Sequence, residues 1–327
     1  MGMACVRLIA SVAAITLSGA SAAQVSADAW PARTVTIIVP LAAGAATDIE
    51  ARLYAQKLTE NLGKPFIVDF KPGAGSTIGT AYVARAAPDG HTLLTMAPTF
   101  TLAPLAYPSL PYDPDKDIVP VSLVSKRPSI FLVHPSLPVK SVTEYIAYAK
   151  ANPGKLNVGT AGAGSLAELG WGWFNSITGI KVTVVNYKGG GPATLALLSG
   201  EVHAALGGIS LLLPQIKTGK LRLIGISTPE RSKILPDVPT MAEQGAPGFS
   251  YAQWIGIGAP GGTPVSIVNK VQTEFARAAR TPEIVQKLEE DGTVIIASTP
   301  EQFRQIITEE TARWRRVARD TGTRLAQ

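Results

Sequence analysis

Cysteine is almost absent from this sequence, which holds only Cys5, within the first few residues. A single cysteine cannot form an internal disulfide, and it cannot supply the cysteine cluster of a structural zinc site. The three histidines, His91, His134 and His203, are far apart and lack the spacing of metal ligands. We therefore expect burial of apolar side chains to stabilise the fold, and we expect no metal or other cofactor.

Long apolar runs are also missing beyond the N-terminus. Arg7 precedes the apolar stretch from Leu8 to Leu17, which is too short to cross a bilayer, and small residues from Gly19 to Ala23 follow it. This order is typical of a secretory signal peptide, so we expect cleavage after Ala23 and a periplasmic mature protein. Cys5 lies ahead of the apolar core, which is the wrong place for a lipid-bearing cysteine.

Charged residues make up only 17% of the chain, and they do not suggest a nucleic-acid-binding surface. The formal net charge of +6 is compatible with nucleic acids or anionic membranes as partners. The basic residues are scattered, however, except for the arginines from Arg313 to Arg319, which Glu309 and Glu310 precede by one turn of a predicted helix. We interpret this cluster as a solvated helix face.

The motifs of common α/β enzymes are missing too. No serine stands in a G-x-S-x-G motif, and no lysine follows the glycine-rich segments as in a phosphate-binding loop. Gly162-x-Gly164-x-x-Ala167 fits a loose dinucleotide pattern, but the next predicted strand ends in Asn186 rather than in an acidic residue. A non-enzymatic function is favoured, and the alternative is an α/β enzyme that binds a nucleotide or anionic cofactor at Gly159–Ser165.

A strand, a loop of very small residues and a helix follow the leader. Val35–Val39 reads as a buried strand, Leu41–Ala46 is the loop, and Thr47 with Glu50 has the spacing of a capping box. Such a loop exposes backbone N–H groups at the positive end of a helix, which suits an anion. An ordinary βα turn of an α/β domain explains these residues equally well.

The same arrangement occurs again in the middle of the chain. A strand ends near Thr160, Ala161–Gly164 has almost no side chains, and Ser165–Glu168 is a second capping box. Ser141–Glu144 has the cap without the small-residue loop, so the composition of the loop carries the functional argument. Two such loops, both without lysine or arginine, predict two lobes that offer N–H groups to one ligand.

Strands and helices alternate along most of the chain, which predicts an α/β fold with parallel strands. An irregular run is expected over residues 98–120, followed by two short strands, Val121–Val124 and Ile130–Val133. Three helices are expected to begin at threonine–proline pairs, a pattern typical of helix starts: Thr263-Pro264, Thr281-Pro282 and Thr299-Pro300.

Several short motifs follow one another from Trp30 to the C-terminal helix. They are Trp30-Pro31, VPLAAGAATD (39–48), KPGAGSTIGT (71–80), PDGHTLL (88–94), LPYDPDKDIVPVS (110–122), GTAGAGS (159–165), YKGGGPA (187–193), LPDVPTMAEQG (235–245) and WIGIGAPGGTP (254–264). In this order they resemble the Bug family, the TctC-like extracytoplasmic solute receptors of tripartite tricarboxylate transporters. The resemblance covers the whole mature chain.

The resemblance implies a two-lobed periplasmic-binding-protein fold of type II, with helix-flanked parallel or mixed sheets and a ligand cleft that closes like a Venus flytrap. Lobe 1 would comprise residues 28–124 and 229–327, and lobe 2 residues 125–228. The protein would be a monomeric, non-catalytic receptor for a small organic acid, namely a dicarboxylate, an aromatic acid or an acidic amino acid. It would deliver this acid to the membrane subunits of a tripartite tricarboxylate transporter.

The family pattern places the ligand carboxylate between the two small-residue loops, held largely by backbone N–H groups. Tyr187, which precedes a glycine run, is added as a candidate wall of the cleft. The predicted ligand-binding residues are Leu41, Ala42, Ala43, Gly44, Ala45, Ala46, Thr47, Asp48, Thr160, Ala161, Gly162, Ala163, Gly164, Ser165 and Tyr187.

The chain departs from the family pattern close to both loops. Gly44-Ala45 replaces the usual Gly-Gly, Ala163 and Glu168 stand where Asn and His are frequent, and His203 stands where Asp is common. Two tryptophans after the second loop, Trp171 and Trp173, either belong to the core or line the cleft. These differences leave the identity of the ligand open.

Overall fold

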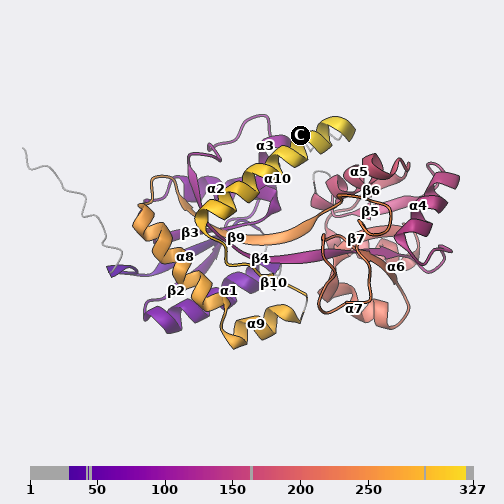
Figure 1. Ribbon diagram of the computed structural model, residues 1–327. Helices are drawn as coiled ribbons and strands as arrows, with labels where there is room; N and C mark the ends of the chain where they lie inside the picture. The colour runs from indigo at the N-terminus through magenta and orange to yellow at the C-terminus, as the bar shows by residue number, and fades with distance from the viewer. Residues whose placement is uncertain (1–28, 42, 44–45, 163–164, 291, 322–327) are drawn as a thin grey trace, which may run out of the picture.

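The computed structural model describes residues 29–41, 43, 46–162, 165–290 and 292–321, and every structural statement below refers to these residues. Figure 1 shows an elongated molecule in which two groups of strands and helices lie next to each other. Two long strands, β4 (Ile118–Val133) and β9 (Ala252–Pro260), run between the groups. The α/β composition predicted from the sequence is confirmed.

The first half is built around three parallel strands. β1 (Val35–Val39) lies between β2 (Phe66–Phe70) and β3 (Thr92–Met96), and β3 in turn pairs antiparallel with β9. Ile37 and Ile38 of β1 are fully buried on opposite faces, because helices cover both sides of this sheet. The helical segments that follow these strands are α1 (Ala46–Leu62), η2 (Ala74–Ser76), α2 (Thr77–Ala84) and α3 (Pro98–Ala106).

Helix α3 occupies the start of the run that was expected to be irregular, so this prediction was wrong for residues 98–106. Pro98 stands in the first turn of the helix, where the missing N–H costs nothing, and Pro104 lies near its C-terminal end. Phe100 and Leu102 are buried against the rest of the protein. Tertiary burial therefore outweighs the low helix propensity of a proline-containing segment.

β4 is a single strand of 16 residues, whereas the sequence predicted two strands separated near Pro128. Its first part pairs with β9 and β10 (Val294–Ile295), and its second part pairs with β7 (Ala204–Gly208) and β8 (Arg222–Ile226). The prediction was wrong because the partner strands change around Pro128 while β4 itself continues. The continuous strand links the two halves.

The second half repeats the parallel arrangement of the first. β5 (Asn157–Thr160) lies between β6 (Thr183–Asn186) and β7, and both pairings are parallel. The carboxyl ends of these strands meet at one edge, which faces the first half because β7 runs antiparallel to β4. The helices of this half are α4 (Val142–Ala151), α5 (Leu166–Thr178), α6 (Gly190–Ser199) and α7 (Ile209–Lys217).

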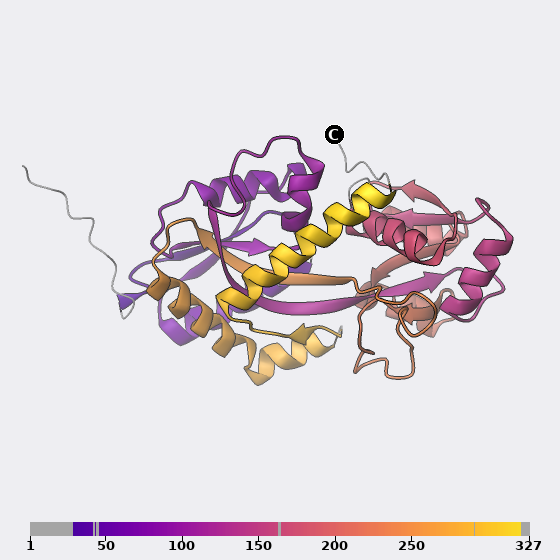
Figure 2. The same ribbon diagram turned by 45° about the horizontal axis from the view of Figure 1, so that its top comes forward.

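Two of the three C-terminal helices begin at the proline of the predicted threonine–proline pair, and the third begins one residue later, at Val265, with Pro264 as its N-cap. They are α8 (Val265–Ala279), α9 (Pro282–Glu289) and α10 (Pro300–Thr321). Figure 2 shows α10 in yellow, reaching from the first half toward the second, where it packs against α5. Arg315, Arg316 and Arg319 are exposed on α10, in agreement with the interpretation of a solvated helix face. Arg313 departs from it, because it is half-buried, donates at 3.2 Å to the carbonyl of Ser250 and lies over the ring of Trp173.

A buried carboxylate joins helix α10 to strand β9. Glu310 accepts hydrogen bonds from the indole Nε1 of Trp254 on β9 at 2.6 Å and of Trp314 at 3.2 Å. Burial raises the pKa of Glu310 above its ordinary value, although both indoles and nearby Arg313 and Lys126 act in the opposite direction. No helix among the described residues is both long and apolar enough to cross a membrane.

An aromatic cluster forms the core of the second half. Phe131 of β4 makes edge-to-face contacts with Tyr145, Trp171 and Phe174, and all four side chains are fully buried. Trp171 is therefore a core residue and does not line a cleft. Trp173 stacks obliquely on Phe249, so it also contributes to packing.

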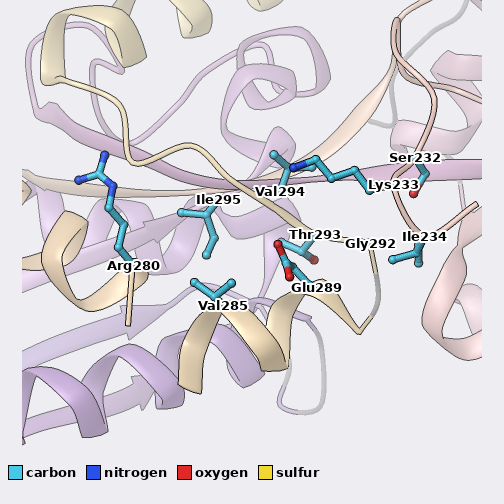
Figure 3. A pocket seen from close by; sticks show the side chains of 10 residues that line it. All are labelled: Ser232, Lys233, Ile234, Arg280, Val285, Glu289, Gly292, Thr293, Val294 and Ile295. Atoms are coloured by element: carbon cyan, nitrogen blue, oxygen red, sulfur yellow. The ribbon is translucent and has the colours of Figure 1, made fainter. Parts of the chain in front are cut away.

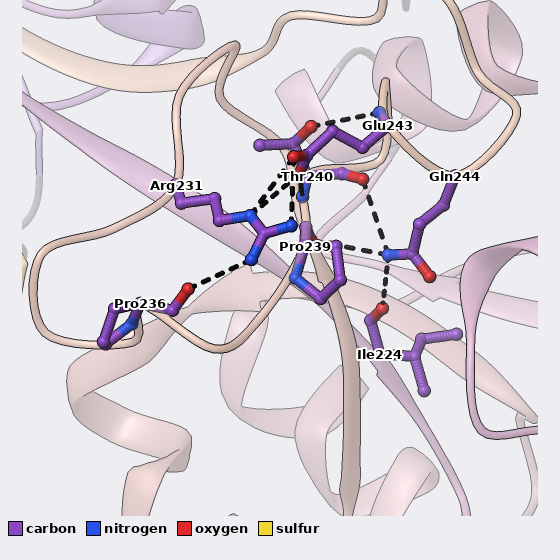
Figure 4. Close-up of polar contacts among 7 residues, drawn as sticks. All are labelled: Ile224, Arg231, Pro236, Pro239, Thr240, Glu243 and Gln244. Carbon is purple, nitrogen blue, oxygen red and sulfur yellow. Dashed lines mark hydrogen bonds and ion pairs between the residues drawn. The ribbon is translucent and has the colours of Figure 1, made fainter.

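The long segment between β8 and β9 is fixed by a polar network (Figure 4). The Arg231 guanidinium donates to both oxygens of Glu243, at 3.1 and 3.2 Å, and Glu243 accepts at 2.6 Å from the backbone N–H of Thr240. Gln244 donates at 2.9 Å to the carbonyl of Ile224 on β8. These bonds anchor a segment that has no helix or strand of its own.

Candidate functional site

Three helices of the second half begin around a single cavity of about 410 Å³. The first residues of α5 and α6 and the N-cap of α7 contribute to its wall, and residues from β4, β5, β7 and β9 complete it. The lining residues are Ser129, Gly159, Thr160, Ala161, Ser165, Leu166, Ala167, Gly190, Gly191, Ala193, Thr194, Leu197, Ala205, Leu206, Gly207, Gly208, Leu212, Tyr251 and Gln253.

This cavity contains part of the predicted ligand-binding set and residues that the sequence did not identify. Thr160, Ala161 and Ser165 line it, as the second small-residue loop led us to expect. The starts of α6 and α7 were not predicted to take part. Gly189–Pro192 and Gly207-Gly208 are glycine-rich helix starts, and this composition could have identified them.

The cavity wall is uncharged, and it carries backbone donors in place of cationic side chains. None of its lining residues is Lys, Arg, His, Asp or Glu. The N-cap residues of α6 and α7 are Gly189 and Gly208, which provide no side-chain cap. The N–H groups of Gly190 and Gly191 have no intrahelical acceptor because they stand in the first turn. The dipoles of three helices therefore point their positive ends at one concave site.

The floor of the cavity consists of neutral side chains where β4 and β9 pass between the halves. Tyr251 is buried, and Ser129 and Gln253 line the same cavity. Burial raises the pKa of Tyr251 to about 12, although the polar side chains of Ser129 and Gln253 oppose the rise. The phenol therefore stays neutral at physiological pH and adds no charge to the cavity.

A short chain of hydrogen bonds fixes one side of the cavity. The Thr160 hydroxyl donates to the side-chain oxygen of Asn186, whose amide nitrogen donates at 2.8 Å to Glu168. Glu168 stands one turn into α5 and is not among the lining residues. Asn186, which ends β6, thus bonds two protein side chains.

The first loop can be placed only in part. Ala42, Gly44 and Ala45 lie outside the described residues, as do Ala163 and Gly164 of the second loop. Helix α1 begins at Ala46, so Thr47 stands inside the first turn and does not cap it as predicted.

The capping box predicted at Thr47 and Glu50 is wrong, because α1 begins one residue before Thr47. The Glu50 carboxylate accepts hydrogen bonds from Ser125, at 2.6 Å, and from Arg127, both on β4. Glu50 thus joins the first turns of α1 to β4. The buried Thr47 hydroxyl has no hydrogen-bond partner among the described residues. Asp48, also buried, pairs at 2.6 Å with Arg52 one turn later.

Two side chains that were considered for the ligand have protein partners instead. The Tyr187 hydroxyl donates at 2.8 Å to Glu201, and Tyr187 is not among the residues that line the cavity. His203 Nδ1 accepts at 3.0 Å from the backbone N–H of Asn157, at the start of β5. Gly162 lies next to the cavity, with its N–H directed at the Thr160 hydroxyl at 3.4 Å.

A second cavity, of about 360 Å³, lies between α9, β10 and the segment around Lys233 (Figure 3). Its wall holds Lys233, Arg280 and Glu289, so it mixes charges of both signs. It contains no predicted ligand-binding residue and no helix N-terminus with free donors. We therefore take the uncharged cavity at the starts of α5, α6 and α7 as the candidate site.

The serine caps predicted in the second half are confirmed and permit a matched test. Ser165 Oγ accepts from Glu168 N–H at 3.2 Å, and Ser141 Oγ accepts from Glu144 N–H at 3.1 Å. We expect Ser165→Ala and Ser141→Ala each to lower the free energy of unfolding by about 1 kcal/mol. Denaturant unfolding checks this, and no loss in either variant would contradict the capping role. Ser141 is remote from the cavity, so Ser141→Ala should leave ligand affinity unchanged.

Comparisons with known proteins agree with this architecture. Residues 50–323 match the family described as tripartite tricarboxylate transporter family receptor, TctC. Protein BugT of Bordetella pertussis is 37% identical over 324 residues, which are 98% of this chain and 98% of BugT. The "UPF0065 protein in tcbD-tcbE intergenic region" of Pseudomonas sp. is 33% identical over 312 residues, which are 95% of this chain and 93% of that protein.

Solved structures show the same fold. One is described as R. palustris Rpa4515 with adipate; it is 35% identical, with a TM-score of 0.79, and the match covers 90% of this chain and 98% of that one. Another, MatC from Rhodopseudomonas palustris with bound malate, is 36% identical with a TM-score of 0.75, and the match covers 88% of this chain and 99% of MatC. The periplasmic binding protein BugD is 31% identical with a TM-score of 0.76, and the match covers 90% of this chain and 99% of BugD. The fold is thus the two-lobed periplasmic-binding-protein fold of type II, and the chain belongs to the receptor family of tripartite tricarboxylate transporters.

Proposed function

We propose that this receptor binds a small organic acid and holds its carboxylate at helix N-termini. The observation that carries the proposal is the convergence of α5, α6 and α7 on one uncharged cavity. Backbone N–H groups at the positive ends of helices bind anions without a cationic side chain. The relatives described with bound adipate and malate support the same class of ligand.

We place the other half of the carboxylate site at the first small-residue loop, Leu41–Asp48. The unpaired, buried hydroxyl of Thr47 at the start of α1 supports this placement. In this proposal the lobes are residues 28–124 with 229–327, and residues 125–228. They close on the ligand about the strands β4 and β9, and the ligand favours the closed state by contacting both lobes.

The receptor is proposed to be a periplasmic, monomeric protein without catalytic activity. Residues 1–23 direct its export and are removed after Ala23, and the mature protein delivers its ligand to the membrane subunits of the transporter. The nucleotide-binding alternative is disfavoured because the end of β6 offers Asn186, whose side chain bonds Thr160 and Glu168. A change in absorbance when NAD or NADP is added with a candidate acid would favour that alternative.

A thermal-shift screen of organic acids tests the proposal. We expect at least one carboxylate to raise the melting temperature, since saturation at about a hundredfold over Kd adds roughly 2.7 kcal/mol when only the folded state binds. EDTA should not change its affinity, because no group of three or more metal-ligating side chains occurs among the described residues. Stabilisation by sugars or cations, with none by any carboxylate, would contradict the proposal.

A further inference from the structure

Helix α10 is packed into the cores of both halves of the protein. Phe303, near its start, is fully buried against Trp254, with ring centroids 5.5 Å apart, and shares an apolar cluster with Ile38 of β1. Trp314, further along the same helix, is buried in the cluster around Phe131 in the second half. One uninterrupted helix thus joins the two halves in addition to β4 and β9 (Figure 2).

The last part of α10 meets α5 around one half-buried side chain, that of Trp173. The ring of Trp173 makes an edge-to-face contact with Trp314, and the ring centroids are 5.9 Å apart. The guanidinium carbon of Arg313 lies 5.6 Å from the centroid of the Trp173 ring, within the range of a cation–π contact. Arg313 also donates at 3.2 Å to the carbonyl of Ser250. These contacts fix α5 against α10 in the arrangement that the structure shows.

The proposed ligand-binding loops are separated from each other in this arrangement. The cavity at the starts of α5, α6 and α7 is lined by residues that all lie between Ser129 and Gln253 in the chain. The described residues of the first small-residue loop, Leu41, Ala43 and Ala46–Asp48, are not among them. A ligand that contacts both loops therefore requires the two halves to move toward each other.

This movement acts on the contact between α10 and α5. The first part of α10 is fixed in the core of the first half, so a rotation about β4 and β9 displaces α5 relative to Trp314. Ring and cation–π contacts weaken steeply with distance, so they are complete only in the separated arrangement. They therefore stabilise that arrangement, and the binding free energy of the ligand must overcome this stabilisation.

We infer that Arg313 and Trp173 are positioning residues that hold the two halves apart and thereby lower the affinity for the organic acid. The inference rests on the proposed function, namely closure of both loops on one carboxylate. The apparent Kd equals the intrinsic Kd divided by the fraction of protein in the closed arrangement. Weakening the contact raises this fraction, so the affinity increases although no residue that touches the ligand is changed.

Calorimetric titration of the mature protein tests the inference, with adipate, malate, benzoate and glutamate as probes. We expect Arg313→Ala and Trp173→Leu each to bind the tightest of these acids at least about threefold more strongly than the wild type does. Denaturant unfolding should show that both variants are less stable than the wild type, because each loses contacts of the folded state. A contact with a merely structural role would lower the stability without raising the affinity.

Arg315→Ala is the matched control, because it removes the same charge from an exposed position on the same helix. It should leave the affinity unchanged, which excludes a general effect of net charge. Trp173→Leu keeps an apolar side chain against Phe249, so it provides a folded variant even if Arg313→Ala unfolds. Unchanged or weaker binding in the folded variants, or an equal gain in Arg315→Ala, would overturn the inference. If none of the four acids binds the wild type, the proposed function fails and the inference fails with it.

Discussion

Replacement of Gly191 by valine is expected to weaken carboxylate binding at least about tenfold, which corresponds to roughly 1.4 kcal/mol. Gly191 stands in the first turn of α6 and lines the candidate cavity. A Cβ atom at this position would meet no other atom within 4 Å, so the protein itself has room for the side chain. The valine would instead cover the space in front of the free N–H groups, where the ligand must come close.

The control for this variant is on the same helix. Leu195 is 67% exposed and does not line the cavity, so Leu195→Ala should leave affinity unchanged. Calorimetric titration with the acid found in the screen gives both affinities, and thermal unfolding shows whether both proteins are folded. Wild-type affinity in folded Gly191→Val would mean that the ligand is not held at the start of α6.

Loss of the Arg127 guanidinium is expected to destabilise the fold by about 3–5 kcal/mol, because it leaves a buried carboxylate without its ionic partner. Arg127 and Glu50 form an ion pair whose side chains are 13% and 1% exposed. Ser125 also donates to Glu50, at 2.6 Å, so α1 is fixed to β4 where this strand passes between the halves. Denaturant unfolding of Arg127→Gln measures the loss.

The Arg231 and Glu243 pair provides a matched comparison at the surface. Both of its side chains are 45% exposed, so Arg231→Gln should cost no more than about 1 kcal/mol. Both variants remove an arginine from an arginine–glutamate ion pair, and the two pairs differ in how deeply they are buried. Equal and small losses in the two variants would show that the buried pair contributes no more than the surface pair, contrary to the role given to Glu50.

Local signals in the sequence were sufficient to locate most helix starts. Ser141 and Ser165 were predicted as caps because their partners are three residues away, and the structure confirms both bonds. The cap at Thr47 was predicted by the same rule and is wrong, since α1 already begins at Ala46. Glu50 bonds Arg127, which is 77 residues away in the chain. A spacing rule cannot detect such a bond, because it depends on how α1 packs on β4.

The candidate site was predicted only in part for the same reason. The small-residue loop before α5 was identified because glycine and alanine leave the backbone bare in that one segment. That the starts of α6 and α7 share its cavity follows from the parallel pairing of β5 with β6 and β7, which no local pattern encodes. Trp171 could not be assigned from sequence either, because only the packing around Phe131 places it in the core.

The central claim, that backbone N–H groups at the start of α6 hold the ligand carboxylate, can be measured directly by amide NMR. Uniformly ¹⁵N-labelled protein is titrated with the acid found in the screen, and the backbone signals of Gly190 and Gly191 are followed. The account predicts that both signals shift strongly and saturate at the calorimetric affinity, since each N–H gains a charged acceptor. It would be contradicted if both signals stayed unchanged at saturation while the largest shifts occurred around Lys233, Arg280 and Val294, in the second cavity.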